Sequence, residues 1–92
     1  MQIRHNHAKR VFEAFGDNDV RMGEIAYSPH DGALAATHTF TEDEFRGRGV
    51  AGQLLDALVE YAVANNLKII PVCSYVKAAF AKDPGKYQSV MC

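Results

Sequence analysis

One stretch decides how this chain is organised: EFRGRGVAGQLL, residues 44–55, a glycine-rich and doubly basic segment that runs into an apolar helical pattern. Its three glycines permit a tight turn and leave backbone N–H groups uncovered by Cβ atoms. A helix that begins here directs its free N–H groups and the positive end of its dipole at the loop. With Arg46 and Arg48 in the loop, the stretch predicts a phosphate or pyrophosphate site. The plainer alternative is a tight loop with solvated arginines.

Two common nucleotide motifs do not fit this loop. No Gly-Lys-Ser/Thr follows at the spacing of a P-loop. Gly47-x-Gly49-x-x-Gly52 matches the dinucleotide fingerprint as letters, but that fingerprint needs an acidic residue about 20 residues later, and none lies near the end of the next strand. Arg46-x-x-Gly49-x-Ala51 instead resembles the Gln/Arg-x-x-Gly-x-Gly/Ala loop of the GNAT superfamily of N-acetyltransferases. In that superfamily the loop amides bind the pyrophosphate of acetyl-CoA.

Outward from the loop, the hydrophobic pattern predicts an α/β fold. Residues 9–15, 20–28 and 34–41 are apolar or alternating runs separated by turn signals, which predicts a three-stranded antiparallel meander. After the loop, apolar residues at i, i+3, i+4 and i+7 predict a helix over 51–62 that stops at Asn65-Asn66.

The segment after this helix predicts the position of a ligand. Residues 67–73 form a short apolar run, typical of a buried strand, although Pro71 cannot donate to a sheet ladder. A helix between two strands makes them parallel neighbours. We therefore expect the strands at 34–41 and 67–73 to splay at their C-terminal ends, beside the glycine-rich loop. Open α/β sheets bind ligands at such a place.

The end of the chain predicts one more helix and an edge strand. Ser74 suits an N-cap, and the helix that follows should end before Pro84. Residues 86–92 are expected to form a short edge strand. The order is therefore β-β-β, loop, α, β, α within a single domain, residues 1–92.

Composition narrows the function classes. The chain is 48% hydrophobic and 23% charged, with a formal net charge of −1, which gives no general attraction to nucleic acid or an anionic membrane. No apolar run resembles a signal peptide or a membrane span. Two cysteines without a CxxC pair favour reduced thiols and a cytoplasmic protein. His5-x-His7 has no further ligand at fixed spacing, so no metal site is expected.

Cys73 and His38 are the residues predicted to do chemistry. Cys73 lies at a strand end directly before a helix start, where the dipole and free amides favour a thiolate able to accept an acyl group. His38 is a candidate base for Cys73 or for an acceptor. Two alternatives stay open: Cys73 as a small buried hydrophobe, and His38 as a hydrogen-bonded core residue.

A wider combination of motifs resembles a small GNAT-like subfamily of about this length. It consists of His38-Thr39, the loop at 46–51 and Pro71-x-Cys73-Ser74-Tyr75, and the resemblance spans most of residues 34–87. It implies a minimal GNAT-like fold with acetyl-CoA between the splayed strands, Cys73 as the acetyl-accepting or catalytic residue, and His38 assisting. The cofactor-binding residues taken from this resemblance are Phe40, Thr41, Arg46, Gly47, Arg48, Gly49, Val50, Ala51, Gly52, Ser74 and Tyr75.

The chain also departs from full-length members of that superfamily. It lacks the two helices that they place after their first strand, and it ends without their closing β-hairpin. The resemblance therefore predicts acetyl-CoA binding, with transfer of the acetyl group to an unidentified amine on a polypeptide or small molecule, by a monomer or weak homodimer. The alternatives are a non-catalytic acyl-CoA-binding module and a thiol redox or sensor protein.

Overall fold

Five strands and three α-helices make up the computed structural model, which describes residues 1–92. The strands are β1 (Gln2–Asn6), β2 (Val11–Phe15), β3 (Arg21–His30), β4 (Ala33–Thr41) and β5 (Lys68–Pro71). The α-helices are α1 (Val50–Ala64), α2 (Ser74–Lys82) and α3 (Pro84–Tyr87), and two single turns of 3-10 helix are η1 (Asp17–Asp19) and η2 (Asp43–Phe45). None of these helices has both the length and the hydropathy that a membrane span requires.

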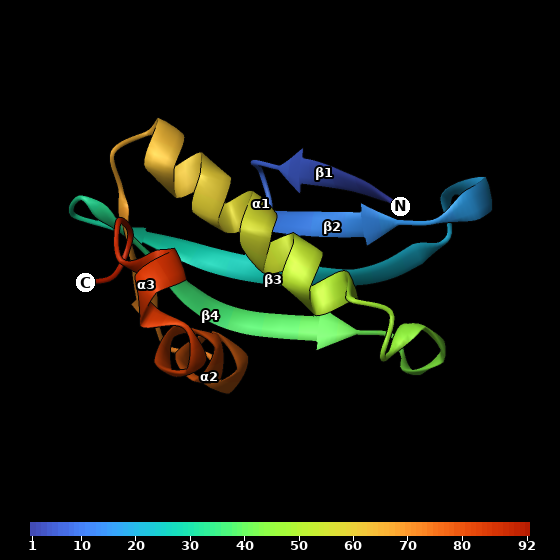
Figure 1. Ribbon diagram of the computed structural model, residues 1–92. Coiled ribbons are helices and arrows are strands. Elements are labelled where there is room, and N and C mark those ends of the chain that lie inside the picture. Colours follow the sequence, from blue (N-terminus) through green and yellow to red (C-terminus); the bar gives the residue numbers. More distant parts are fainter.

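The strands form one sheet in the order β1-β2-β3-β4-β5. Neighbours from β1 to β4 are antiparallel, whereas β4 and β5 are parallel and pair from Ala33 opposite Lys68 to Ala36 opposite Pro71. Helix α1 crosses between these two strands and lies across one face of the sheet (Figure 1). The predicted α/β class, the antiparallel meander and the parallel crossover are confirmed.

The core lies between α1 and the sheet. The apolar stripe of α1 is buried as its periodicity predicts, at Val50, Leu54, Leu55, Leu58 and Ala62. It packs in one cluster with apolar residues from every part of the chain, including Ile25 on β3, Leu34 and Ala36 on β4, and Ile69 on β5. Burying one such aliphatic side chain contributes about 1.5–3 kcal/mol. This cluster therefore sets the position of the start of α1 relative to β4.

Several predicted boundaries were wrong. Strand β1 was not predicted, and it pairs along its length with β2. Strand β5 ends at Pro71 instead of residue 73. The N-cap of α2 is Cys73, and Ser74 is its first residue. Two of these differences move the end of an element by one or two residues, and the third adds a strand at the edge of the sheet.

The tail was predicted as an edge strand and is mostly helical. Asp83 caps α3 by accepting a hydrogen bond from the Lys86 N–H at 3.3 Å, and Pro84 occupies the first turn. Only an isolated bridge between Met91 and Ile69 resembles the predicted strand. Asp83-Pro84 is thus a helix start as well as the end of α2.

Candidate active site

Strand β4 extends beyond its parallel partner, because β5 ends at Pro71 instead of running on and diverging as predicted. We call this one-sided end of β4 the splayed end. The last paired residues are Ala36 and Pro71, whereas β4 continues to Thr41. The Cys73 N–H then donates to the Ala36 carbonyl at 2.8 Å, after which the chain turns into α2. The edge of β4 from Thr37 onward therefore has no strand beside it on this side.

A cavity of about 340 Å³ lies at this unpaired end. It is lined by Thr39 and Thr41 of β4, by the glycine-rich loop with the first turn of α1, and by Tyr75 of α2. A second groove of about 480 Å³ runs on between α1 and α2–α3, and Gly52 and Tyr75 border both. Each has the size that small-molecule sites have.

The loop has the conformation that an anion site needs. Gly47 and Gly49 have φ of +80° and +77°, in the left-handed region where a side chain is disfavoured. Gly49 is the N-cap of α1, and no side chain caps the helix there. The free N–H groups of the first turn and the positive end of the helix dipole therefore face the cavity, as predicted.

Most of the predicted cofactor-binding residues line this cavity: Thr41, Arg46, Gly47, Gly49, Val50, Ala51, Gly52 and Tyr75. Phe40, Arg48 and Ser74 do not. The Arg48 guanidinium lies 5.5 Å from the centre of the Phe45 ring and lines a hollow on the other side of the loop. Arg46 is the loop cation on the cavity side, where it also pairs with Asp43 at 3.2 Å.

Cys73 lies at the start of α2 with its sulfur against β4. The sulfur is 3.3 Å from the Thr39 hydroxyl oxygen. Burial opposes ionisation of this thiol, yet hydrogen bonds to its sulfur outweigh burial and lower the pKa of Cys73. The donors, in decreasing order of effect, are the Thr39 hydroxyl and the backbone N–H groups of Val76, Tyr75 and Thr39. Cys73 is therefore a half-buried thiol whose thiolate the fold stabilises, unlike an inert core cysteine.

His38 points away from Cys73. In β4 the bulge at Thr37 shifts the alternation, so that Thr39 pairs with core residue Ile25 and continues the helix-facing row, while His38 pairs with Ala26. His38 and Phe40 stack on the opposite face, 6.4 Å between ring centres. The hydrogen bonds of the chain include none between His38 and Cys73. The interpretation of His38 as a core residue is wrong, because 55% of its side chain is exposed.

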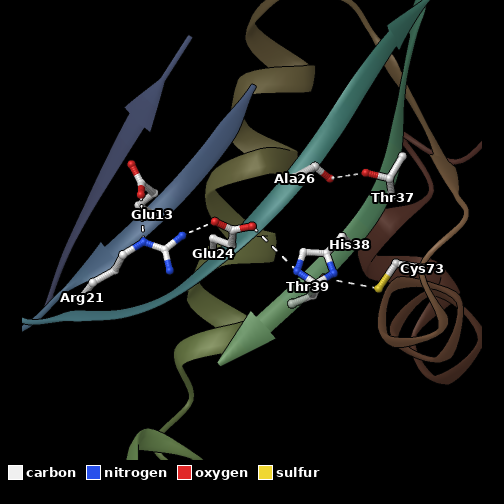
Figure 2. A network of polar contacts seen from close by, with 8 residues as sticks. All are labelled: Glu13, Arg21, Glu24, Ala26, Thr37, His38, Thr39 and Cys73. Atoms are coloured by element: carbon white, nitrogen blue, oxygen red, sulfur yellow. Dashed lines mark hydrogen bonds and ion pairs between the residues drawn. The ribbon is translucent and has the colours of Figure 1, made fainter. Parts of the chain in front are cut away.

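A polar network continues from His38 across the open face of the sheet (Figure 2). Glu24 lies 3.7 Å from the His38 ring nitrogen Nε2 and pairs with Arg21, whose Nε donates to Glu13 at 2.8 Å. Figure 2 also shows the Cys73–Thr39 contact on the other side of β4. Strand β4 therefore carries Thr39, the partner of the Cys73 thiol, on one face and the imidazole of His38 on the other.

Thr39 and Phe45 also line the cavity, although neither was among the predicted site residues and Thr39 was noted only as part of the His38-Thr39 motif. A local signal existed for Thr39, because Thr39 and Thr41 occur at the strand period of two and so share one face. No local signal pairs Thr39 with Cys73, since 34 residues separate them. Phe45 ends the turn η2 that leads into the loop.

The site can do two things chemically. The cavity offers helix N–H groups and Arg46 to an anionic group. Cys73 does not line the cavity, but its sulfur contacts Thr39, which does, and it offers a stabilised thiolate. A substrate that joins a phosphate anchor to an electrophilic carbonyl would engage both.

Comparisons with known proteins agree with this geometry. A family model described as GCN5-related N-acetyl-transferase matches residues 11–90. A solved structure of a GCN5-like N-acetyltransferase candidate from Staphylococcus aureus is similar at a TM-score of 0.77 and 36% identity, over 99% of this chain and 87% of that one.

Proposed function

The chain belongs to the GCN5-related N-acetyltransferase family, and on that premise we propose that it binds acetyl-CoA at the glycine-rich loop and transfers the acetyl group through Cys73 to an amine. The observation that supports this most directly is that Thr39, at the end of β4, lines the cavity at the uncapped start of α1 and also contacts the stabilised thiol of Cys73. Family membership supports acetyl transfer from acetyl-CoA; the role of Cys73 is our own proposal.

The loop and the groove fit the two charged parts of acetyl-CoA. At Gly47 and Gly49 an added Cβ would meet no atom within 4 Å, so the backbone N–H groups stand open to a pyrophosphate. The groove between α1 and α2–α3 is lined by Lys82 and Lys86, which suit the 3′-phosphate. Lys86 already lies 3.5 Å from Asp56, so a phosphate would compete with that exposed carboxylate.

Cys73 supplies the nucleophile. Its sulfur attacks the thioester carbonyl carbon, an S–C bond forms, and the bond from that carbon to the sulfur of CoA breaks, releasing CoA as a thiolate that takes a proton from water. The acceptor amine then attacks the acetylated cysteine, an N–C bond forms, and the Cys73 thiolate leaves. Two easier displacements replace one, as in other covalent catalysis.

His38 is proposed as the base that takes the proton from the acceptor amine. Its side chain is exposed on the face opposite the cavity, next in sequence to Thr39. Because no ladder closes the sheet beyond Ala36 and Pro71, an amine can approach the acetyl group from the His38 side. Donor and acceptor would then occupy opposite faces of β4.

Isothermal titration with acetyl-CoA and with CoA tests the donor site. We expect stoichiometric binding by the wild-type chain, and its absence would overturn the proposal. Gly49→Val should abolish binding, since the new side chain strains the loop and blocks its N–H groups. Gly32→Val is the matched control, because Gly32 also has a positive φ, of 69°, and open space around it but lies in the β3–β4 turn. Binding by Gly49→Val equal to that of Gly32→Val would remove the loop from the site.

The release of free CoA thiol in the presence of candidate amines tests transfer. A lysine-containing peptide and a small polyamine serve as the two acceptor arms. Release that depends on either amine supports an acetyltransferase. Tight binding of CoA with no release in either arm, and no acetylated Cys73, would favour the acyl-CoA-binding module.

A further inference from the structure

Thr39 is the side chain that meets the Cys73 sulfur, and it does so because of two irregularities in the sheet. The bulge at Thr37 turns Thr39 to the helix-facing side of β4. The end of pairing at Pro71 leaves that side of β4 free for the start of α2. The Thr39 and Cys73 side chains thereby come within 3.3 Å.

The hydroxyl of Thr39 can form a hydrogen bond with the Cys73 sulfur in both its thiol and its thiolate form. In the thiol form the S–H of Cys73 donates to the Thr39 oxygen at 3.3 Å. A hydroxyl is both donor and acceptor and rotates freely, so on ionisation its hydrogen can turn toward the thiolate. A hydrogen bond to an ionised group is about twice as strong as a neutral one. The contact therefore favours the thiolate over the thiol.

We propose that Thr39 is a positioning residue that holds the ionised sulfur of Cys73 against β4, beside the cavity that Thr39 itself lines. Its use in acetyl transfer rests on the proposed function, but the hold on the sulfur does not. No other side chain of β4 can replace it: Thr41 lies two residues further along the strand, about 6–7 Å away, and His38 and Phe40 face the other side.

Other groups near the sulfur do not reproduce this effect. Tyr75 on α2 is a titratable neighbour, and the Cys73 charge contributes to raising the pKa of its phenol, after burial and other charges. His38 on β4 faces Glu24 on the opposite side of the sheet. Lys77 is exposed one turn into α2 and donates its backbone N–H to the Cys73 carbonyl. The remaining donors to the sulfur are backbone N–H groups, which a side-chain substitution leaves in place.

The test is the pH profile of Cys73 alkylation by iodoacetamide, followed peptide by peptide so that Cys92 is counted separately. Thr39→Val keeps the shape and the strand preference but lacks the hydroxyl, and should move the Cys73 midpoint upward by about one pH unit. Thr39→Ser should restore a midpoint close to that of the wild type. Thr41→Val is the control, because Thr41 is a threonine on the same face of the same strand that lies too far along it to contact the sulfur. It should leave the profile unchanged, as should every variant for Cys92.

An unchanged midpoint in Thr39→Val, or equal shifts in Thr39→Val and Thr41→Val, would overturn the assignment. The experiment needs no acetyl-CoA, so it separates this inference from the proposed function. A shifted midpoint in a chain that never binds acetyl-CoA leaves Thr39 as the positioning residue and removes the acetyltransferase. Acetyl transfer through Cys73, together with an unchanged Cys73 midpoint in Thr39→Val, would support the acetyltransferase and remove Thr39 as the positioning residue. Far-ultraviolet circular dichroism checks that each variant is folded.

Discussion

The two ends of the sheet are built in opposite ways. At the β1–β3 end, the His5 ring stacks on Phe12 with centroids 4.0 Å apart, meets Tyr61 of α1 edge-on at 4.7 Å and hydrogen-bonds the Tyr27 hydroxyl at 2.5 Å. At the β4–β5 end, pairing stops at Pro71, and beyond it Thr39 and Thr41 of β4 line a cavity. Aromatic packing therefore fixes α1 on the sheet at the β1–β3 end, whereas the N–H groups at the start of α1 stay free at the β4–β5 end.

This contrast predicts that damage at the packed end lowers stability, whereas damage at the splayed end lowers ligand binding. The two readouts are separable, since one is the free energy of unfolding in urea and the other is the affinity of the folded chain for CoA.

Leu58→Ala should have the largest effect. Leu58 is fully buried in the middle of α1 (0% exposed), and its truncation should cost about 2–5 kcal/mol of unfolding free energy by removing contacts and leaving a cavity. Val63→Ala on the same helix is the control, because Val63 is 54% exposed, and should stay within about 0.5 kcal/mol. Urea titration followed by circular dichroism measures both. Equal losses in the two variants would contradict the placement of α1 on the sheet.

Arg46→Ala should weaken CoA binding more than Arg48→Ala, although the two residues look alike in the sequence. Only Arg46 lines the cavity, and its exposure and its pairing with Asp43 reduce its contribution to about 1 kcal/mol, roughly fivefold in Kd. The Arg48 side chain lies over Phe45 on the far side of the loop. Isothermal titration calorimetry with CoA measures the Kd of both variants. A greater loss of CoA affinity for Arg48→Ala would contradict this assignment and would show that the loop changes conformation when CoA binds.

The pH dependence of stability should show a small effect of His5. Burial, and then the charge of His7, lower the pKa of His5 below its usual 6.5. The unfolded chain therefore binds the proton more readily, and the stability due to neutral His5, full above about pH 6.5, is lost as the pH falls through the lower folded-state pKa. Urea unfolding between pH 7.5 and about 5.5 should show a shallower slope in His5→Phe than in the wild type.

His30→Ala is the control for this slope, because His30 is an exposed histidine of the β3–β4 hairpin. Its replacement removes an imidazole without disturbing the aromatic cluster. A slope that flattens equally in His30→Ala and His5→Phe would mean that the packed end contributes nothing to the pH dependence.

Much of this architecture follows from local sequence patterns. The strands β2 to β4, helix α1 and the loop were predictable because turn residues, alternation and the 3.6-residue period all agree there. Strand β1 was not, because Ile3 is its one aliphatic residue, and its order comes from pairing with β2 and from the stacking of His5. The tail was mistaken for a strand because Pro84 was taken only as a helix stop, although Asp83 before it is an N-cap residue.

The candidate site was predictable only in part. The glycine-rich loop and Cys73 carry local signals, and Cys73 at the start of α2 gains the predicted help from the helix N–H groups. The orientation of His38 carries no such signal. An unbroken alternation from Leu34 and Ala36 would have placed His38 and Phe40 in the cavity. The bulge at Thr37, which depends on pairing with β3, gives that place to Thr39 and Thr41.

Mass spectrometry after incubation with acetyl-CoA tests most directly whether the splayed end is a reaction site. We expect one acetyl group on Cys73, none on the exposed Cys92, and none on the Cys73→Ser variant, because an unactivated hydroxyl is a far weaker nucleophile than a thiolate. The affinity of Cys73→Ser for CoA should stay within a few fold of the wild type, since the phosphate contacts lie in the loop. An unmodified Cys73, together with normal acetyl transfer to an amine by Cys73→Ser, would contradict transfer through Cys73 and indicate direct transfer from acetyl-CoA.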